Sequence, residues 1–341
     1  MRAAMIVGPR QIVIEEVAIP QPAPGEALVR VAACGICGSD VSFYKGAPDY
    51  SISYPAIAGH EMAGIVEEIN GAGDRLVVGD RVAVEPLIAC GECYACRVGE
   101  YNCCADLKVI GAHVPGGFAE YVVAPLNRCH AIPASMAWHI GAAVEPYTIG
   151  ANVVRRGQVT DRDTVIINGA GTIGLTVLDT ARNVIGARVL ITDLLDERLD
   201  RAAALGADRV VNARREDVNH HVMAFTGGEG ASVVVDATGN PDVIGNLENQ
   251  VAPAGRCVIV GYSDSAVCFS GINIIKKEMT VLGSRNSCNA YPGVIDMASN
   301  GTLHLDQLVT QRYEFDQIGE AFQFAADCPE LAGKVVVEFS L

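Results

Sequence analysis

The sequence predicts an α/β protein in which a doubly wound parallel sheet is inserted into a mainly antiparallel, barrel-like β domain. Three observations predict this arrangement. Short strands separated by glycine and proline turns fill the first part of the chain, strand, turn and helix alternate after Gly150, and the chain returns to a strand at Lys334–Phe339. We therefore expect one domain from residues 1–150 and 286–341 and a second from residues 151–285.

The N-terminal segment has the pattern of short, half-buried strands. Gln11–Val17 alternates polar and apolar residues, and Ala27–Val31 follows after a proline-rich turn. Met62–Ile69 and Asp80–Val84 continue the same pattern. We expect these strands to pair antiparallel and to carry polar site residues on their connections.

Cys37 and His60 each stand in a glycine-bounded turn, Cys37 in Cys-Gly-Ile-Cys-Gly-Ser-Asp and His60 in Gly-His-Glu. Taken singly, such a cysteine is more typical of a small buried side chain, and such a histidine of a hydrogen-bonded residue. Together the two side chains can bind one zinc ion from two loops. Glu145 offers a third ligand, and three protein ligands leave the open position that a catalytic zinc requires.

A second group of cysteines has the spacing C-x-x-C-x-x-C at Cys90, Cys93 and Cys96, followed after a short loop by Cys103 and Cys104. Four thiolates close a tetrahedral site without an open position, which is typical of a structural zinc. The spacing alone leaves the choice between Cys103 and Cys104 open. An iron–sulfur cluster is disfavoured, because no proline follows the last cysteine and the loop length differs from that of ferredoxins.

A glycine-rich turn follows the first buried strand of the second domain, Asp163–Asn168. We expect Gly169 to permit a tight turn, Gly171 to let the backbone approach a pyrophosphate, and Gly174 to let the following helix pack on the strand. Asp193 ends the next strand, about twenty residues later, which completes the dinucleotide-binding fingerprint of the Rossmann fold.

Asp193 also predicts which dinucleotide binds. Its carboxylate can accept hydrogen bonds from both hydroxyls of a ribose, whereas a 2′-phosphate would place a second anion beside it. Leu194 and Leu195 follow where an NADP site more often has a cation. We therefore expect NAD. Arg198, one helical turn later, is a further candidate for contact with the ribose, and an exposed helix charge is the alternative interpretation.

The rest of this domain continues the alternation that builds a parallel sheet. The predicted helices are Leu175–Val184, Glu197–Leu205, Asn219–Phe225 and Val243–Val251, and the predicted strands are Arg188–Asp193, Arg209–Val211, Ser232–Asp236 and Arg256–Val260. Beyond Met279–Gly283 we expect mixed structure.

Composition excludes several kinds of partner. The formal net charge of −15 disfavours nucleic acid and anionic membranes, because both attract basic surfaces. No apolar run is long enough to span a bilayer and the first residues do not resemble a signal peptide, so we expect a cytoplasmic protein. Under those conditions the 12 cysteines are more typical of thiols and metal ligands than of disulfides, which remain the alternative.

As a set, these residues resemble the zinc-containing medium-chain dehydrogenase/reductase family over essentially the whole chain. The resemblance is carried by residues 34–40, residues 59–61, the cysteine group, Glu145-Pro146 and the glycine-rich turn. Glu rather than Cys at position 145 is similar to the polyol and sugar-acid branch, which includes sorbitol, threonine and galactonate dehydrogenases. The resemblance implies a GroES-like catalytic domain around a Rossmann domain.

The resemblance also implies roles for individual residues. It favours Cys104 as the fourth ligand of the structural zinc and adds Glu61 as an alternative to Glu145 at the catalytic zinc. Asp40 is similar to the acid that hydrogen-bonds the zinc histidine, with a turn-capping residue as the alternative. Ser39 is similar to the hydroxyl that passes the alcohol proton toward solvent, with a helix cap as the alternative.

Three further positions follow from the same resemblance. Ile173 is expected to pack behind the nicotinamide ring, with a plain core position as the alternative. Arg285 is expected to pair with the cofactor pyrophosphate or a substrate carboxylate, with a surface arginine as the alternative. Many relatives have a histidine where this chain has Ser42, so we expect the proton to leave through water or the cofactor ribose.

The function expected from these residues is zinc-dependent oxidation of a secondary hydroxyl of a small polyol or sugar acid, with hydride transfer to NAD and two zinc ions per chain. L-threonine or a simple secondary alcohol such as butanediol is an alternative substrate. A non-catalytic, NAD-sensing zinc scaffold is the alternative of another class. The joint presence of Cys37, Ser39, His60 and Glu145 argues against it, since only chemistry requires an open zinc. The family resemblance implies a homodimer or homotetramer.

Overall fold

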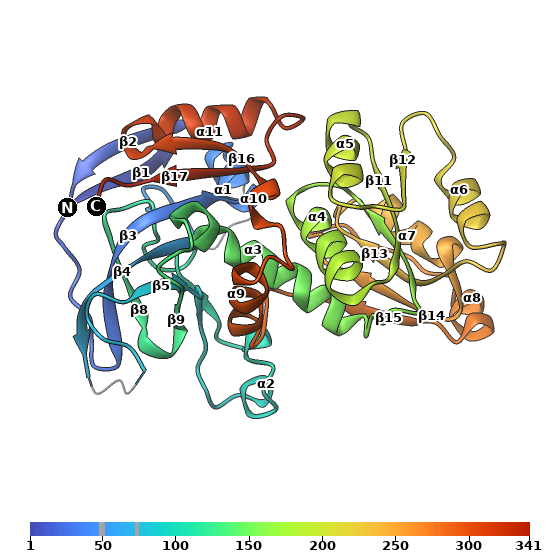
Figure 1. The fold of residues 1–341 in the computed structure, drawn as a ribbon, viewed down its shortest axis with the longest axis horizontal. Helices are drawn as coiled ribbons and strands as arrows, with labels where there is room; N and C mark the ends of the chain where they lie inside the picture. Colours follow the sequence, from blue (N-terminus) through green and yellow to red (C-terminus); the bar gives the residue numbers. More distant parts are fainter. Residues whose placement is uncertain (48–51, 72–74) are drawn as a thin grey trace. The chain divides into compact units, whose positions relative to one another are not determined.

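The computed structural model describes residues 1–47, 52–71 and 75–341, which form two compact units (Figure 1). The first unit comprises Met1–Glu145, Tyr291–Ser299 and Leu305–Leu341. The second comprises Pro146–Ala290 and Asn300–His304.

A seven-stranded sheet organises the first unit, with the order β16-β17-β3-β4-β5-β9 and with β8 paired to β3. All of its pairings are antiparallel except that of β16 with β17. The strands are β3 (Glu26–Ile36), β4 (Glu61–Asn70), β5 (Arg81–Val84), β8 (Tyr121–Pro125), β9 (Cys129–Ala131), β16 (Val309–Glu314) and β17 (Lys334–Glu338). Strand β17 pairs with β3, so the last strand joins the N-terminal sheet as the sequence predicts.

Small elements surround this sheet. Strands β1 and β2 form one two-stranded sheet, and β6 and β7 form another. Helix α11 packs on β16, β17, β2 and α1 and closes a core that contains Phe43, Phe118 and Phe322. Their bounds are β1 (Arg2–Gly8), β2 (Gln11–Glu16), β6 (Leu87–Ile88), β7 (Lys108–Val109), α1 (Gly38–Tyr44), α2 (Tyr94–Arg97), α9 (Tyr291–Ser299), α10 (Leu305–Leu308) and α11 (Ile318–Asp327), with short 3₁₀ turns at Tyr101–Cys103, Leu126–Arg128 and Phe315–Gln317.

The second unit is a six-stranded, all-parallel sheet in the order β12-β11-β10-β13-β14-β15. Helix α5 packs on β11 and β12, and α7 packs on β13 and β14. The elements are β10 (Thr164–Asn168), β11 (Arg188–Asp193), β12 (Arg209–Asn212), β13 (Ala231–Asp236), β14 (Val251–Ile259), β15 (Thr280–Gly283), α4 (Thr172–Asp179), α5 (Asp196–Ala204), α6 (Val218–Phe225), α7 (Pro241–Gln250) and α8 (Gly271–Lys277). This is the predicted doubly wound sheet. The predicted helix Leu175–Val184 is α4 continued by a π-helical turn at Thr180–Ile185.

Helix α3 (Trp138–Arg156) was not predicted from the sequence. It contains Pro146, which removes one backbone hydrogen bond and normally ends or kinks a helix. Ala142 of this helix shares a buried cluster with Ala33 of β3 and Val336 of β17, and this packing outweighs the proline. Among the described residues, the structure contains no helix that is long and apolar enough to cross a membrane.

Candidate functional site

Cys37, His60 and Glu61 converge at one end of the β3–β4 pair. Cys37 directly follows β3 and caps the N-terminus of α1, while Glu61 begins β4 opposite Gly35 of β3. One ligand atom from each of Cys37, His60 and Glu61 lies within 4.8 Å of the others. A thiolate, an imidazole and a carboxylate at this spacing form a donor set suited to zinc.

Asp40 links two members of this group. One of its oxygens accepts the backbone N–H of Cys37 at 2.8 Å, and the other lies 3.7 Å from Nδ1 of His60. Burial lowers the pKa of His60, but the combined effect of the neighbouring Asp40 and Cys37, which raise it, is larger. The pKa of His60 therefore lies well above its usual value. A carboxylate beside Nδ1 orients the ring and leaves Nε2 as the natural metal-binding nitrogen.

Glu61 is held by Lys334, a residue that the sequence analysis did not single out. The ammonium group lies 2.5 Å from Oε1 of Glu61, and both side chains are almost fully buried. Oε2 of Glu61 is also buried, and among the described residues it has no hydrogen-bond partner. A buried carboxylate oxygen without a partner is costly unless a cation binds it, so this atom fits the role of a zinc ligand.

Glu145 lies on α3, about one helical turn after Ala142, the residue that packs against β3 and β17. It does not belong to the three-ligand group found among the described residues, although it interacts electrostatically with His60, Glu61 and Lys334. Burial raises the pKa of Glu145 to about 7. Ser39 lies in the first turn of α1 and is partly exposed.

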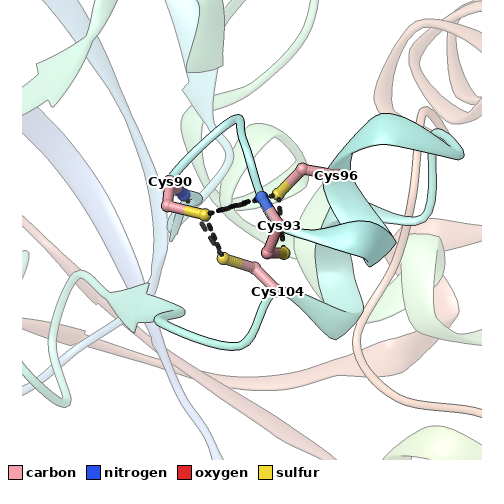
Figure 2. A group of neighbouring side chains, drawn as sticks. All are labelled: Cys90, Cys93, Cys96 and Cys104. Atoms are coloured by element: carbon pink, nitrogen blue, oxygen red, sulfur yellow. Dashed lines mark hydrogen bonds between the residues drawn. The ribbon is translucent and has the colours of Figure 1, made fainter.

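The four cysteines of the second group form the compact cluster drawn in Figure 2. The Sγ–Sγ distances are 3.4 Å between Cys90 and Cys104, 3.5 Å between Cys93 and Cys96, and 4.0 Å between Cys90 and Cys96. Backbone N–H groups point at the sulfurs, and such donors lower the pKa of Cys93 to about 6. Cys103, by contrast, is exposed, so the geometry favours Cys104 as the fourth ligand.

A chain of contacts between residues from separate segments links this lobe to the sheet. Tyr101, in the turn before Cys104, has the guanidinium of Arg128 3.9 Å from its ring centroid. Arg128 and His130 each lie 3.0 Å from a carboxylate oxygen of the buried Glu85. No motif spacing marks these residues, because they come from separate segments and meet only through packing.

The glycine-rich turn lies between β10 and α4 in the second unit. Gly169 has φ +101°, which is strained for residues with a side chain. A Cβ on Gly174 would lie 1.8 Å from the carbonyl oxygen of Gly169, so only glycine allows α4 to begin this close to the turn. Around Gly171 the nearest atom to a built Cβ is Nη1 of Arg198 at 3.9 Å, which leaves the backbone open to a ligand.

Asp193 is fixed beside this turn. Its Oδ2 accepts the N–H of Ala170 at 2.8 Å, and its Oδ1 accepts the N–H of Leu194 at 2.7 Å. Nη1 of Arg198 lies 3.6 Å from Oδ2, so the two predicted ribose-binding residues lie together. The carboxylate is thus oriented by the backbone on both oxygens before any cofactor binds.

The other residues predicted to contact the cofactor, Ile173 and Arg285, also lie in the second unit. Ile173 lies in the first turn of α4 and is partly buried. Arg285 follows β15 with an exposed side chain, and the Asn152 amide donates hydrogen bonds to the carbonyls of Arg285 and Asn286, at 3.5 and 3.0 Å. The backbone that carries Arg285 is therefore anchored to α3.

Two family models match the chain. The alcohol dehydrogenase GroES-like domain matches residues 23–134, and the zinc-binding dehydrogenase domain matches residues 172–300. The chain belongs to the zinc-binding alcohol dehydrogenase family. The predicted resemblance to zinc-containing medium-chain dehydrogenases and their polyol branch is confirmed, as is the predicted enzyme class, an oxidoreductase of the zinc alcohol or polyol dehydrogenase type.

Several relatives match over nearly their whole length. The starvation-sensing protein RspB of Escherichia coli K12 is 35% identical over 100% of both chains, and sorbitol dehydrogenase of Bacillus subtilis is 31% identical over 99% of this chain and 97% of its own. A crystal structure of the rspB alcohol dehydrogenase of Escherichia coli CFT073, complexed with cofactor NADH, has a TM-score of 0.94 at 35% identity and covers 99% of both chains.

Proposed function

We propose that this dehydrogenase oxidises a secondary hydroxyl of a small polyol or sugar acid and transfers the hydride to NAD. The observation that carries the proposal is the convergence of Cys37, His60 and Glu61, together with the buried Oε2 of Glu61, which has no hydrogen-bond partner among the described residues. A purely structural metal site would use four closed ligands, as the cysteine lobe does. The similarity to sorbitol dehydrogenase supports the polyol class.

In this proposal Cys37, His60 and either Glu61 or Glu145 hold the catalytic zinc, and the geometry favours Glu61. When bound, zinc supplies a Lewis acid that polarises the substrate hydroxyl. Asp40 holds His60 in the ring orientation that presents Nε2. Ser39, partly exposed beside Cys37, accepts the hydroxyl proton and passes it toward solvent.

The glycine-rich turn of the second unit is the proposed NAD site. The backbone at Gly171, which no side chain crowds, would bind the pyrophosphate, and the Asp193 carboxylate would accept hydrogen bonds from the ribose hydroxyls. Arg198 and Arg285 contribute positive charge to this site, and Ile173 contributes apolar surface behind the nicotinamide. The similarity to a structure complexed with NADH supports this cofactor.

The cysteine lobe completes the proposal as a second, structural zinc site formed by Cys90, Cys93, Cys96 and Cys104. We further propose that residues 1–150 and 286–341 form the catalytic domain, that residues 151–285 form the NAD domain, and that the protein is a homodimer or homotetramer.

Metal content and substrate oxidation test the proposal together. Purified wild-type protein should contain two zinc ions per chain by elemental analysis, and Cys37→Ser should retain only the zinc of the cysteine lobe. Wild type should reduce NAD with polyols or aldonates in preference to L-threonine and butanediol, and should use NAD with a higher kcat/KM than NADP. Zinc in the lobe alone, without dehydrogenase activity, would instead support the non-catalytic scaffold.

A further inference from the structure

Lys334 is a buried lysine whose position links three strands of the first unit. It begins β17 and is 1% exposed. Its Nζ donates to Oε1 of Glu61 at 2.5 Å and to the backbone carbonyl of Ile36 at 3.1 Å. A buried lysine is rare unless it is paired, and here the charge partner is a candidate zinc ligand.

The hydrogen bond between Lys334 of β17 and Glu61 of β4 crosses the intervening strand β3. Strand β3 lies between β17 and β4, and Gly35 of β3 stands opposite Glu61. A Cβ on Gly35 would lie 2.0 Å from Oε2 of Glu61. The missing side chain therefore provides the space in which the carboxylate crosses β3 to reach the ammonium group.

The charges around this pair are unbalanced. Lys334 interacts electrostatically with Glu61, Cys37 and Glu145, and also with Asp40. The zinc of the proposed function would bind within the same group of anions. Lys334 occupies Oε1 of the Glu61 carboxylate, and Oε2 has no hydrogen-bond partner among the described residues, so a zinc ion bound here would share this carboxylate with the lysine.

We propose that Lys334 is a positioning residue: it binds one oxygen of Glu61 and so lowers the affinity of this carboxylate for the catalytic zinc. The inference rests on the proposed function, since it requires zinc at Cys37 and His60. The partner of a metal-bound histidine usually strengthens that ligand by accepting a hydrogen bond from its second ring nitrogen. Lys334 acts in the opposite sense, because a cation that donates to a carboxylate withdraws its charge from the metal and prevents it from binding through both oxygens.

The test is competition for the zinc of the holoenzyme by a coloured chelator, with Cys37→Ser used to identify the signal of the lobe zinc. Lys334→Met and Lys334→Gln both remove the charge, and Gln retains a hydrogen-bond donor. Each should bind the Cys37-dependent zinc about tenfold more tightly than wild type, whereas removing a partner of a metal ligand usually lowers metal affinity by about tenfold or more. Lys334→Arg keeps the charge and should retain a nearly wild-type affinity.

The Glu61→Gln background provides the matched control. Adding Lys334→Met to Glu61→Gln removes both charges, so a folded double variant is expected, and its zinc affinity should differ little from that of Glu61→Gln alone. The visible spectrum of the cobalt-substituted enzyme gives a readout other than activity, and it should change between wild type and Lys334→Met as Glu61 binds more closely.

The outcomes distinguish failure of the role of Lys334 from failure of the proposed function. Equal or weaker zinc binding in both neutral variants, with circular dichroism unchanged, would overturn the role of Lys334 and leave the proposed function intact. An equally large effect of Lys334→Met in the Glu61→Gln background would also overturn it, because the effect would then not pass through Glu61. Absence of any Cys37-dependent zinc in wild type would overturn the proposed function and this inference with it.

Discussion

Gly35 shows how one residue controls the position of Glu61 among the candidate zinc ligands Cys37, His60 and Glu61. A Cβ at this position would lie 2.0 Å from Oε2 and 3.2 Å from Cβ of Glu61, so a side chain cannot be added without displacing the carboxylate. The glycine is therefore required by the close approach of Glu61 and not by its own backbone conformation.

We expect Gly35→Ala to lower the free energy of unfolding by about 1–3 kcal/mol, the usual cost of overpacking a core. It should also reduce the zinc that depends on Cys37, because Glu61 is displaced from the group. Chemical denaturation and elemental analysis measure both effects. Gly38→Ala is the matched control, since no atom lies within 4 Å of a Cβ built on Gly38. Full stability and full zinc content in Gly35→Ala would contradict the proposed packing.

At the scale of elements, the cysteine lobe is a short segment whose own core is small. Leu87, Cys104 and Leu107 are its buried apolar residues, and β6 and β7 form only a two-stranded sheet. Such a segment has little buried area of its own, so the proposed zinc and the contact between Tyr101 and Arg128 are expected to stabilise it.

Cys104→Ser is therefore expected to lose one zinc per chain and at least about 2 kcal/mol of stability, because three thiolates remain around an incomplete site. Cys103→Ser changes the adjacent, exposed thiol and should keep both zinc ions and the wild-type stability. Elemental analysis and thermal unfolding of the two variants compare these outcomes. Equal losses in both variants would show that Cys103 shares the ligand role.

At the scale of the whole molecule, each unit depends on contacts between segments that are distant in the sequence. In the second unit the Asp163 carboxylate accepts hydrogen bonds from the backbone and hydroxyl of Thr160 at 2.7 and 3.0 Å, and pairs with Arg256 of β14 at 2.5 Å. Arg256 also donates to the carbonyls of Gly157 and Gln158. These bonds tie the turn before β10 to β14.

This contact predicts a dependence of stability on pH. Burial raises the pKa of Asp163, but the combined effect of hydrogen bonds from Ser232 and Thr160 and of the charge of Arg256, which lower it, is larger. The pKa of Asp163 therefore lies below the usual 3.8. A carboxylate with a lowered pKa stabilises the fold above its unfolded value, and this contribution is lost as the pH falls through the folded value.

Asp163→Asn should therefore be less stable than wild type by about 2–3 kcal/mol near neutral pH, as expected for breaking a partly buried charged hydrogen bond. The difference should shrink as the pH falls below 3.8, where wild type also loses the charge. Urea denaturation at a series of pH values measures this, with the exposed Asp161→Asn as the control. A difference that stays constant through the acid range would contradict the ionic origin of the effect.

Local spacing in the sequence was enough to predict the Cys37 and His60 motifs, the cysteine lobe, the glycine-rich turn and the alternation of strand and helix. Each of these patterns depends on residues only a few positions apart. The fold class followed from these patterns. Helix α3 could not be predicted in this way, since the packing of Ala142 against β3 and β17 stabilises it despite Pro146.

Tertiary structure alone decided how the candidate site is completed. Cys37, Gly35 and Glu61 meet through the register of β3 with β4, and Lys334 reaches them from a strand 273 positions beyond Glu61 in the sequence. Strand register and packing set these contacts, and neither is encoded in the spacing of one motif. The candidate ligands could therefore be proposed from the sequence, whereas the buried lysine that pairs with Glu61 became evident only in the folded sheet.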